Sequence, residues 1–298
     1  MEKERSNEPS MEYKIIIDTK FEETFGKFKC ININWLYDII LICERNNIDN
    51  RIITDLITQL TTPENLIKMR KTKNFLIDSI HVEQEKSFFK YIEGLDKENK
   101  QQYIQQGVLF ALDNLTEDKN IVDNFIKYIV LTNYSDIEYV STIPNLNHNN
   151  TAYVNCYLGG LELCHNTNIT ISEHGNNDIE CEWFHTRRGL QGLKLGAQIM
   201  RKLMLDVQKH FPDKNIISFN VLKNNLGAIR FYCNNGGELF DITTGEKIDK
   251  ESLQPDAKGS LGVVFDRSKF QEIIDREIVI PEINSKYLSS NEETCEVQ

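Results

Sequence analysis

The chain has 298 residues, of which 40% are hydrophobic and 27% are charged, so it can bury one large core or two ordinary ones. Its formal net charge of -11 argues against a nucleic-acid partner, because the phosphate backbone favours clustered lysine and arginine. The same charge suits a cationic acceptor such as a polyamine, an aminoglycoside or a lysine side chain.

The seven cysteines are scattered and include no Cys-x-x-Cys pair, which predicts reduced thiols in a cytoplasmic protein and no metal site. The polar segment 1–10 is not typical of a signal peptide, and the apolar run 39–43 is too short to span a bilayer. We therefore expect no membrane partner. The polar segment Ser289 to Thr294 resembles the acidic export tails of secreted bacterial effectors, so secretion into a host cell stays an alternative.

Residues 1–140 are expected to form a mainly helical region whose role the sequence leaves open. Apolar residues recur at spacings of three and four over 35–43 and 52–60, and the same texture continues to about residue 130. Thr62 and Pro63 indicate a helix start, with Thr62 as N-cap.

The texture changes after the polar stretch 145–150, where β-branched and aromatic residues become frequent. Strands are expected at 152–163, 169–172, 179–186, 217–221, 238–242 and 261–265. Helices are expected at about 195–210 and 226–234. The sequence thus predicts an α/β domain over 141–275 and a flexible polar tail over 276–298.

The first motif that carries chemistry joins a strand to an amphipathic helix. It consists of Gln191, Gly192, Leu193, Lys194, Leu195, Gly196 and Ala197. The first turn of a helix has unpaired N–H groups and a partial positive charge, and glycines let the backbone close on an anion. This loop suits a pyrophosphate, although its glycine spacing differs from the dinucleotide motif G-x-G-x-x-G.

The second motif follows the next expected strand. Asn224 and Asn225 end that strand, and an asparagine side chain can cap the helix that follows. Ala228 is small where a ligand chain can pass, and Tyr232 lies one turn further on the same helix face. Gly236-Gly237 ends the motif.

Together these motifs resemble the GNAT superfamily of N-acetyltransferases, over roughly residues 150–270. Gln191 and Gly196 fit the ends of the family loop Arg/Gln-x-x-Gly-x-Gly/Ala, whereas Lys194 stands at its inner glycine. The later family signature is fitted by Asn225, with Asn224 as alternative, Ala228, Tyr232 and Gly236-Gly237. The family's first strand and first two helices should lie between about 80 and 140.

The resemblance implies a splayed mixed β-sheet flanked by helices, with acetyl-CoA as co-substrate where two parallel strands part. The backbone of Phe184, His185 and Thr186 would pair with its pantetheine arm. The N–H groups from Gly192 to Ala197 would hold its pyrophosphate. Lys194 would either add positive charge there or crowd the anion.

The resemblance also implies direct transfer of the acetyl group to an amine, on a small molecule or a protein, without a covalent enzyme intermediate. Tyr232 would protonate the leaving thiolate, or only pack its helix. The candidate bases are Glu180, Glu182 and His185, which could equally be surface residues. A strand's period of two puts the glutamates on one face and His185 on the other, unless a bulge intervenes.

A hypothesis from a different class makes the chain a catalytically silent module that binds acetyl-CoA or another protein. Lys194, which departs from the family loop, and the unaligned first half are the features that favour it.

Overall fold

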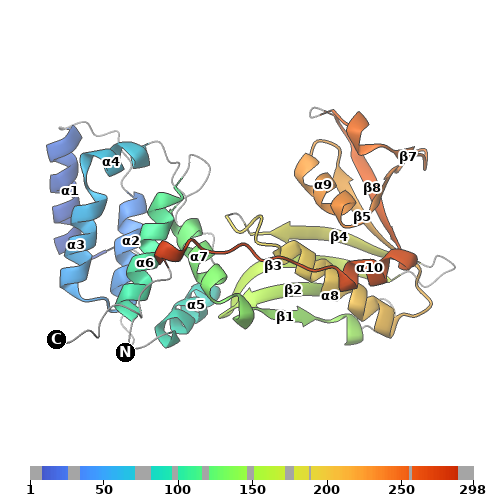
Figure 1. The fold of residues 1–298 in the computed structure, drawn as a ribbon, viewed down its shortest axis with the longest axis horizontal. Helices are drawn as coiled ribbons and strands as arrows, with labels where there is room; N and C mark the ends of the chain where they lie inside the picture. The colour runs from blue at the N-terminus through green and yellow to red at the C-terminus, as the bar shows by residue number, and fades with distance from the viewer. Residues whose placement is uncertain are drawn as a thin grey trace.

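The computed structural model describes residues 9–25, 34–70, 82–95, 100–115, 121–145, 151–171, 178–187, 189–254 and 257–287. The first half forms a block of helices, and the second half forms a mixed sheet with helices on it (Figure 1). This confirms the expected α/β fold with a helical N-terminal region.

The helices of the first half follow the apolar spacing of the sequence. In α3 (Asn50–Leu60) the buried residues form one stripe, and Asp49 caps the start by accepting the Arg51 N–H at 2.8 Å. The other described helices of this half are α1 (Met11–Phe25), α2 (Asn34–Arg45), α4 (Pro63–Arg70), α5 (Val82–Gly94), α6 (Lys100–Asp113) and α7 (Ile121–Thr132). Among the described residues, no helix has both the length and the apolar character needed to cross a membrane.

One sheet organises the second half, with strand order β1-β2-β3-β4-β5-β8-β6-β7. Neighbouring strands run antiparallel except β4 and β5, which are parallel. The strands are β1 (Glu138–Ser141), β2 (Ala152–Leu158), β3 (Leu161–Ile171), β4 (Asp178–Thr186), β5 (Ile216–Leu222), β6 (Glu238–Asp241), β7 (Lys247–Ile248) and β8 (Ser260–Asp266). Helices α5, α6 and α7 precede β1 in the chain, and these elements lie between residues 82 and 141.

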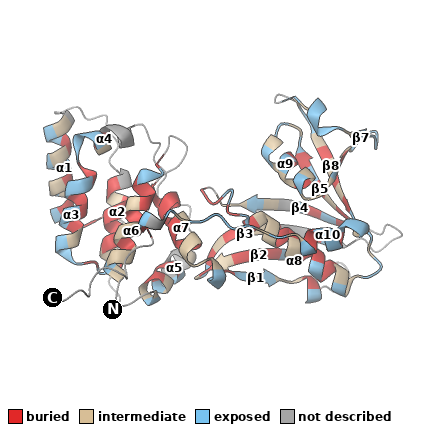
Figure 2. Ribbon diagram, in the orientation of Figure 1, coloured by how far each residue is buried: buried red, intermediate tan, exposed pale blue. Residues whose placement is uncertain are grey.

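Helices cover one face of this sheet. Helix α8 (Leu195–His210) packs on β1 to β4, and α10 (Phe270–Asp275) packs on α8. Helix α9 (Leu226–Asn234) packs near β6 through its buried Ile229 and Tyr232. We call this covered side the inner face and the opposite side the outer face. Figure 2 shows buried residues along the strands and on the sides of the helices that meet them.

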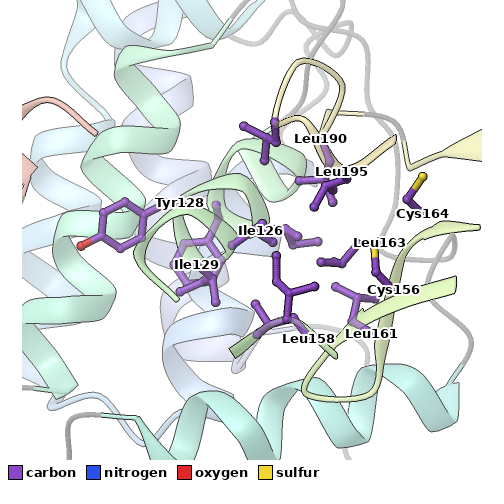
Figure 3. Packing of buried hydrophobic residues seen from close by; sticks show 14 of the residues in the cluster. Ile126, Tyr128, Ile129, Cys156, Leu158, Leu161, Leu163, Cys164, Leu190 and Leu195 are labelled. Carbon is purple, nitrogen blue, oxygen red and sulfur yellow. The ribbon is translucent and has the colours of Figure 1, made fainter. Parts of the chain in front are cut away.

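The helical block and the sheet meet through a continuous apolar core. Ile126 and Ile129 of α7 approach Leu158 and Leu161 at the turn between β2 and β3 (Figure 3). The same turn lies against α5, since a Cβ at Gly159 would come within 2.4 Å of the Tyr91 side chain. The first half of the chain thus supports the β2–β3 hairpin.

The expectation of a flexible tail from residue 276 is corrected over residues 276–287. These residues return across the molecule to the helical block (Figure 1). Tyr287 is buried there, with its ring centroid 5.2 Å from that of Phe110 and its hydroxyl hydrogen-bonded to Asp113. Burial of Tyr287 anchors this segment, although its polar composition predicts an unstructured tail. Residues 288–298 lie outside the described part of the chain.

The contact between the β2–β3 turn and α5 can be tested by adding one methyl group. Gly159 has φ +54° and no room for a Cβ, so Gly159→Ala should lower the free energy of unfolding by about 1–3 kcal/mol from backbone strain alone. Gly94→Ala is the matched control, because nothing lies within 4 Å of the position that its methyl group would take, and the change should be neutral or stabilising. Urea unfolding measures both, and equal stabilities would contradict the packing described.

Candidate functional site

The parallel strands β4 and β5 part midway along their length. They pair from Asp178 with Ile216 to Cys181 with Phe219, but β4 continues to Thr186. Strand β5 continues instead along β8, and Figure 1 shows both rising away from β4. In the described part of the chain, the edge of β4 that faces β5 therefore has no strand partner over 182–186. This is the splayed arrangement that the family resemblance implies.

Three residues predicted to contact pantetheine, Phe184, His185 and Thr186, lie along this open edge. Their other edge is held in the sheet by pairing with Asn166, His165 and Cys164 of β3. Backbone groups on the open edge can pair with an extended ligand much as they would with another strand. The structure thus places the predicted stretch where a ligand chain can lie.

Aromatic side chains line the inner side of the gap. The Phe184 ring centroid lies 5.4 Å from that of Phe231 and 6.2 Å from that of Tyr232, both on α9. Tyr232 in turn lies 5.0 Å from Phe219 of β5. Gly196 completes the group, since a Cβ there would be 3.2 Å from Phe184 and 3.4 Å from Phe231. The start of α8 therefore meets the gap where a glycine permits close approach.

Tyr232 is 5% exposed, and its hydroxyl has no hydrogen-bond partner among the described residues. Burial raises the pKa of this phenol, and the nearby Cys181 and Cys164 thiols raise it further. The group therefore stays protonated at neutral pH. A phenol in this form can donate a proton, as the predicted role of Tyr232 requires.

Two residues in the loop before α8 have a positive φ angle, in the left-handed region of backbone conformation. Gly192 has φ +87° and Lys194 has φ +63°. A non-glycine residue in this left-handed region costs about 1–2 kcal/mol. Lys194 thus occupies a position where the family has glycine and where the backbone conformation also favours glycine. Its side chain is exposed.

Buried leucines anchor this loop. Leu193 and Leu195 are both buried, so their side chains face the core and only their backbone can reach a ligand. The Tyr134 hydroxyl donates to the Leu193 carbonyl at 3.0 Å, and the Leu193 N–H donates to the Leu190 carbonyl at 3.3 Å. The Leu193 N–H is therefore already bonded within the loop. The expectation that it would be free to bind a pyrophosphate is thus corrected for this residue.

The amides that follow are better placed for an anion. Gln198 donates to the Lys194 carbonyl at 3.1 Å in the first hydrogen bond of α8. Leu195, Gly196 and Ala197 precede this bond, so their N–H groups have no helical partner. Unpaired N–H groups at a helix start, together with the helix dipole, are the arrangement in which a phosphate group can bind. Gln191 and Gly192 are exposed beside it.

The two asparagines after β5 separate into different roles. The Asn225 side-chain oxygen accepts the Ala228 N–H at 3.2 Å and caps α9, as the sequence predicts. Asn224 is exposed at the end of the strand. The cap therefore occupies the Asn225 side-chain oxygen, and both asparagines are exposed where β5 ends.

The alternation of β4 is broken between Cys181 and Phe184. Asn166 pairs with Phe184 and Ile169 pairs with Cys181, and across β3 these two residues lie opposite Val154 and Ala152, between which the β2–β3 register shifts. Two residues three positions apart therefore face the same inner side, as a bulge would allow. The three candidate bases are all exposed and belong to the outer face: Glu180, Glu182 and His185.

These three residues differ in their distance along the strand from the gap. Glu180 lies in the closed section, paired with Ser218 of β5, whereas His185 lies in the open section. The His185 ring centroid is 5.3 Å from that of His165, whose Nδ1 is 2.8 Å from a Glu162 carboxylate oxygen. Sequence reasoning missed Glu162 and His165 because only the β3–β4 register brings them to His185.

Other titratable groups nearby have structural surroundings. Burial lowers the pKa of Arg187, and Asp123 of α7 opposes that shift, so Arg187 lies toward the helical block. Arg188 lies outside the described residues. Over the ranges that the structure describes, no group of three or more His, Cys, Asp or Glu side chains could hold a metal ion.

Two substitutions of Lys194 can separate the effect of backbone conformation on stability from the effect of the side-chain charge. Lys194→Gly should raise the free energy of unfolding by about 1 kcal/mol relative to Lys194→Ala, because only glycine relieves the left-handed strain. Both variants lose the same charge, so the difference between them reports backbone conformation. Equal urea unfolding midpoints for the two variants would contradict the loop geometry.

No protein-family profile matches the chain, and no curated protein matches it. Solved structures do match its second half. An acetyltransferase from Bacillus subtilis in complex with CoA is 11% identical, with 39% of this chain and 76% of that chain covered and a TM-score of 0.31. A GNAT family acetyltransferase from Elizabethkingia anophelis with acetyl-CoA bound is 8% identical, with 44% and 98% covered and a TM-score of 0.33.

A GNAT family acetyltransferase from Staphylococcus aureus is 12% identical, with 55% of this chain and 92% of that chain covered and a TM-score of 0.31. Independently of these matches, the parted parallel pair β4 and β5 is the arrangement that the family resemblance implies. The second half of the chain is similar in fold to the GNAT acetyltransferases.

Proposed function

We propose that this protein transfers the acetyl group of acetyl-CoA directly to an amine on a small molecule or a protein. The observation that carries the proposal is the open edge of β4, which lies beside both the free amides of α8 and the buried Tyr232. The pantetheine arm would pair with 184–186 of β4, and the pyrophosphate would meet the amides of 195–197. The thioester would then lie between the open strand and Tyr232.

The chemistry needs few groups from the protein. The amine nitrogen attacks the thioester carbonyl, the C–N bond forms and the C–S bond breaks. Tyr232 donates its proton to the departing CoA sulfur and regains one from the reaction's released proton or from water. Its raised pKa keeps this phenol in the donor form.

A catalytically silent CoA-binding module is the second candidate. It is favoured by the Phe184 and Phe231 rings, which pack together at the inner side of the gap, and by the strained Lys194. The two candidates differ in one observable. Only the enzyme releases free CoA thiol when an amine is added to protein and acetyl-CoA.

Cofactor binding should stabilise the folded protein, because a ligand that binds only the native state shifts the unfolding equilibrium. Acetyl-CoA should raise the melting temperature of the wild type, and Gly196→Leu should abolish the rise because its side chain would meet Phe184 and Phe231. Gly94→Ala, with open space at that position, should keep the full rise. If titration calorimetry detects no binding to the wild type at millimolar acetyl-CoA, both candidates fail.

Removal of the Tyr232 hydroxyl should slow turnover while leaving cofactor affinity nearly unchanged. General acid catalysis supplies roughly 100-fold or more, so Tyr232→Phe should lose about that factor in kcat. The ring contacts of Tyr232 are kept in phenylalanine, and Tyr153→Phe at an exposed strand position serves as control. An unchanged kcat would mean that another group or water protonates the thiolate.

A further inference from the structure

Five polar side chains gather on the outer face of the sheet, away from α8 and α9. They are Asn155 and Tyr157 of β2, Glu162 and His165 of β3, and His185 of β4. Tyr157 pairs with Glu162, Asn155 with His165, and His165 with His185. Residues directly opposite on neighbouring strands share a face, so the register itself assembles this outer-face cluster.

Hydrogen bonds centre the cluster on Glu162. One carboxylate oxygen lies 2.8 Å from His165 Nδ1, and the other accepts from Asn155 Nδ2 at 3.1 Å and from the Tyr157 hydroxyl at 3.3 Å. The hydrogen bond to His165 lowers the pKa of Glu162 despite burial, and the hydrogen bond from Tyr157 lowers it further. The carboxylate therefore stays ionised at neutral pH.

The cluster also contains a buried acceptor that the protein leaves unused. Asn155 is 6% exposed, and its Oδ1 has no hydrogen-bond partner among the described residues. A buried polar atom of this kind costs stability unless something outside the chain satisfies it. An acceptor oxygen beside an ionised carboxylate is suited to N–H donors that carry a positive charge.

His185 is the member of the cluster that can take up a proton. Its ring makes no hydrogen bond within the described ranges, and partial burial lowers its pKa, with the positive charge of His165 adding to the effect. Glu162 opposes this shift, and Arg187 at the end of the strand reinforces it. The imidazole is therefore neutral at pH 7 and can act as an acceptor.

We propose that the outer-face cluster is the site for the acceptor, bound as a primary ammonium, and that His185 removes its proton. This inference rests on the proposed acetyl transfer. His185 lies in the open section of β4, where the thioester would be, whereas Glu180 lies in the closed section opposite Ser218. Glu162 and His165 act as positioning residues that set the charge around His185.

The step balances without any further reactant. His185 takes one proton from the ammonium, and the neutral amine attacks the thioester carbonyl. The C–N bond forms, the C–S bond breaks, and the nitrogen's second proton replaces the one that Tyr232 gives to the CoA sulfur. His185 then releases its proton to water, so that one proton is produced for each acetyl group transferred.

The 298-residue chain can be tested with two probes, spermidine and a lysine-containing peptide blocked at its N-terminus. CoA thiol release is measured against pH, together with calorimetric CoA affinity. His185→Gln should lower kcat/KM by about 100-fold or more at pH 7 with unchanged CoA affinity. His210→Gln on α8 and Glu246→Gln in the β6–β7 turn are matched controls and should keep the wild-type rate.

The positioning residues should move the acidic limb of the pH profile in opposite directions. Glu162→Gln removes a charge that raises the His185 pKa, so the limb should move to lower pH. His165→Gln removes a charge that lowers it, so the limb should move to higher pH. A merely structural role for either residue would change the rate without these opposed shifts.

Histidine ring NMR with spermidine separates this inference from the proposed function. A spermidine-induced shift of the His185 ring without thiol release would leave the amine site standing and sink the acetyl transfer. Binding of CoA with no shift of that ring by either probe would overturn the amine site, whichever acceptor is later found. Full activity in His185→Gln, or loss of activity in Glu180→Gln alone, would assign the proton to another group and also overturn it.

Discussion

The separation of β4 from β5 after Cys181 is the constraint on which the rest of the site depends. Backbone N–H and C=O groups inside a sheet need partners, so an interior strand edge is left open only where something holds the strands apart. Here α9 packs Phe231 and Tyr232 against Phe184 and Phe219, which come from the two parted strands. These rings lie between the two strands where they part, and the edge of β4 that a ligand can use stays open.

The same separation gives the two faces of the sheet different chemistry. The inner face is aromatic beside the gap, and burial there raises the pKa of Tyr232. The outer face is polar and is organised by the Glu162 carboxylate. The helical block adds rigidity to this arrangement, because Tyr134 bonds the Leu193 carbonyl and the β2–β3 turn packs against α5. The first half of the chain therefore contacts both the loop and the hairpin beside the gap.

Local signals allowed much of this to be predicted from the sequence. Helix α8 occupies Leu195–His210 as its apolar spacing indicates, and Asn225 caps α9 as its residue type suggests. The register between β3 and β4 has no such signal, so Glu162 and His165 could not be connected to His185. The burial of Tyr287 was equally hidden, since its partners Phe110 and Asp113 lie far back in the chain. Spacing also could not show that the alternation of β4 breaks after Cys181, which moves His185 to the face of the glutamates.

The central claim is that acetyl-CoA occupies the gap between β4 and β5, and amide hydrogen exchange tests it most directly. The open edge over 184–186 and the first turn of α8 over 195–197 should both become protected when acetyl-CoA is added. The antiparallel pair β1–β2 should keep its exchange rates, because it lies on the far side of the sheet from the gap. Protection that appears elsewhere while 184–186 continues to exchange freely would contradict this account of the site.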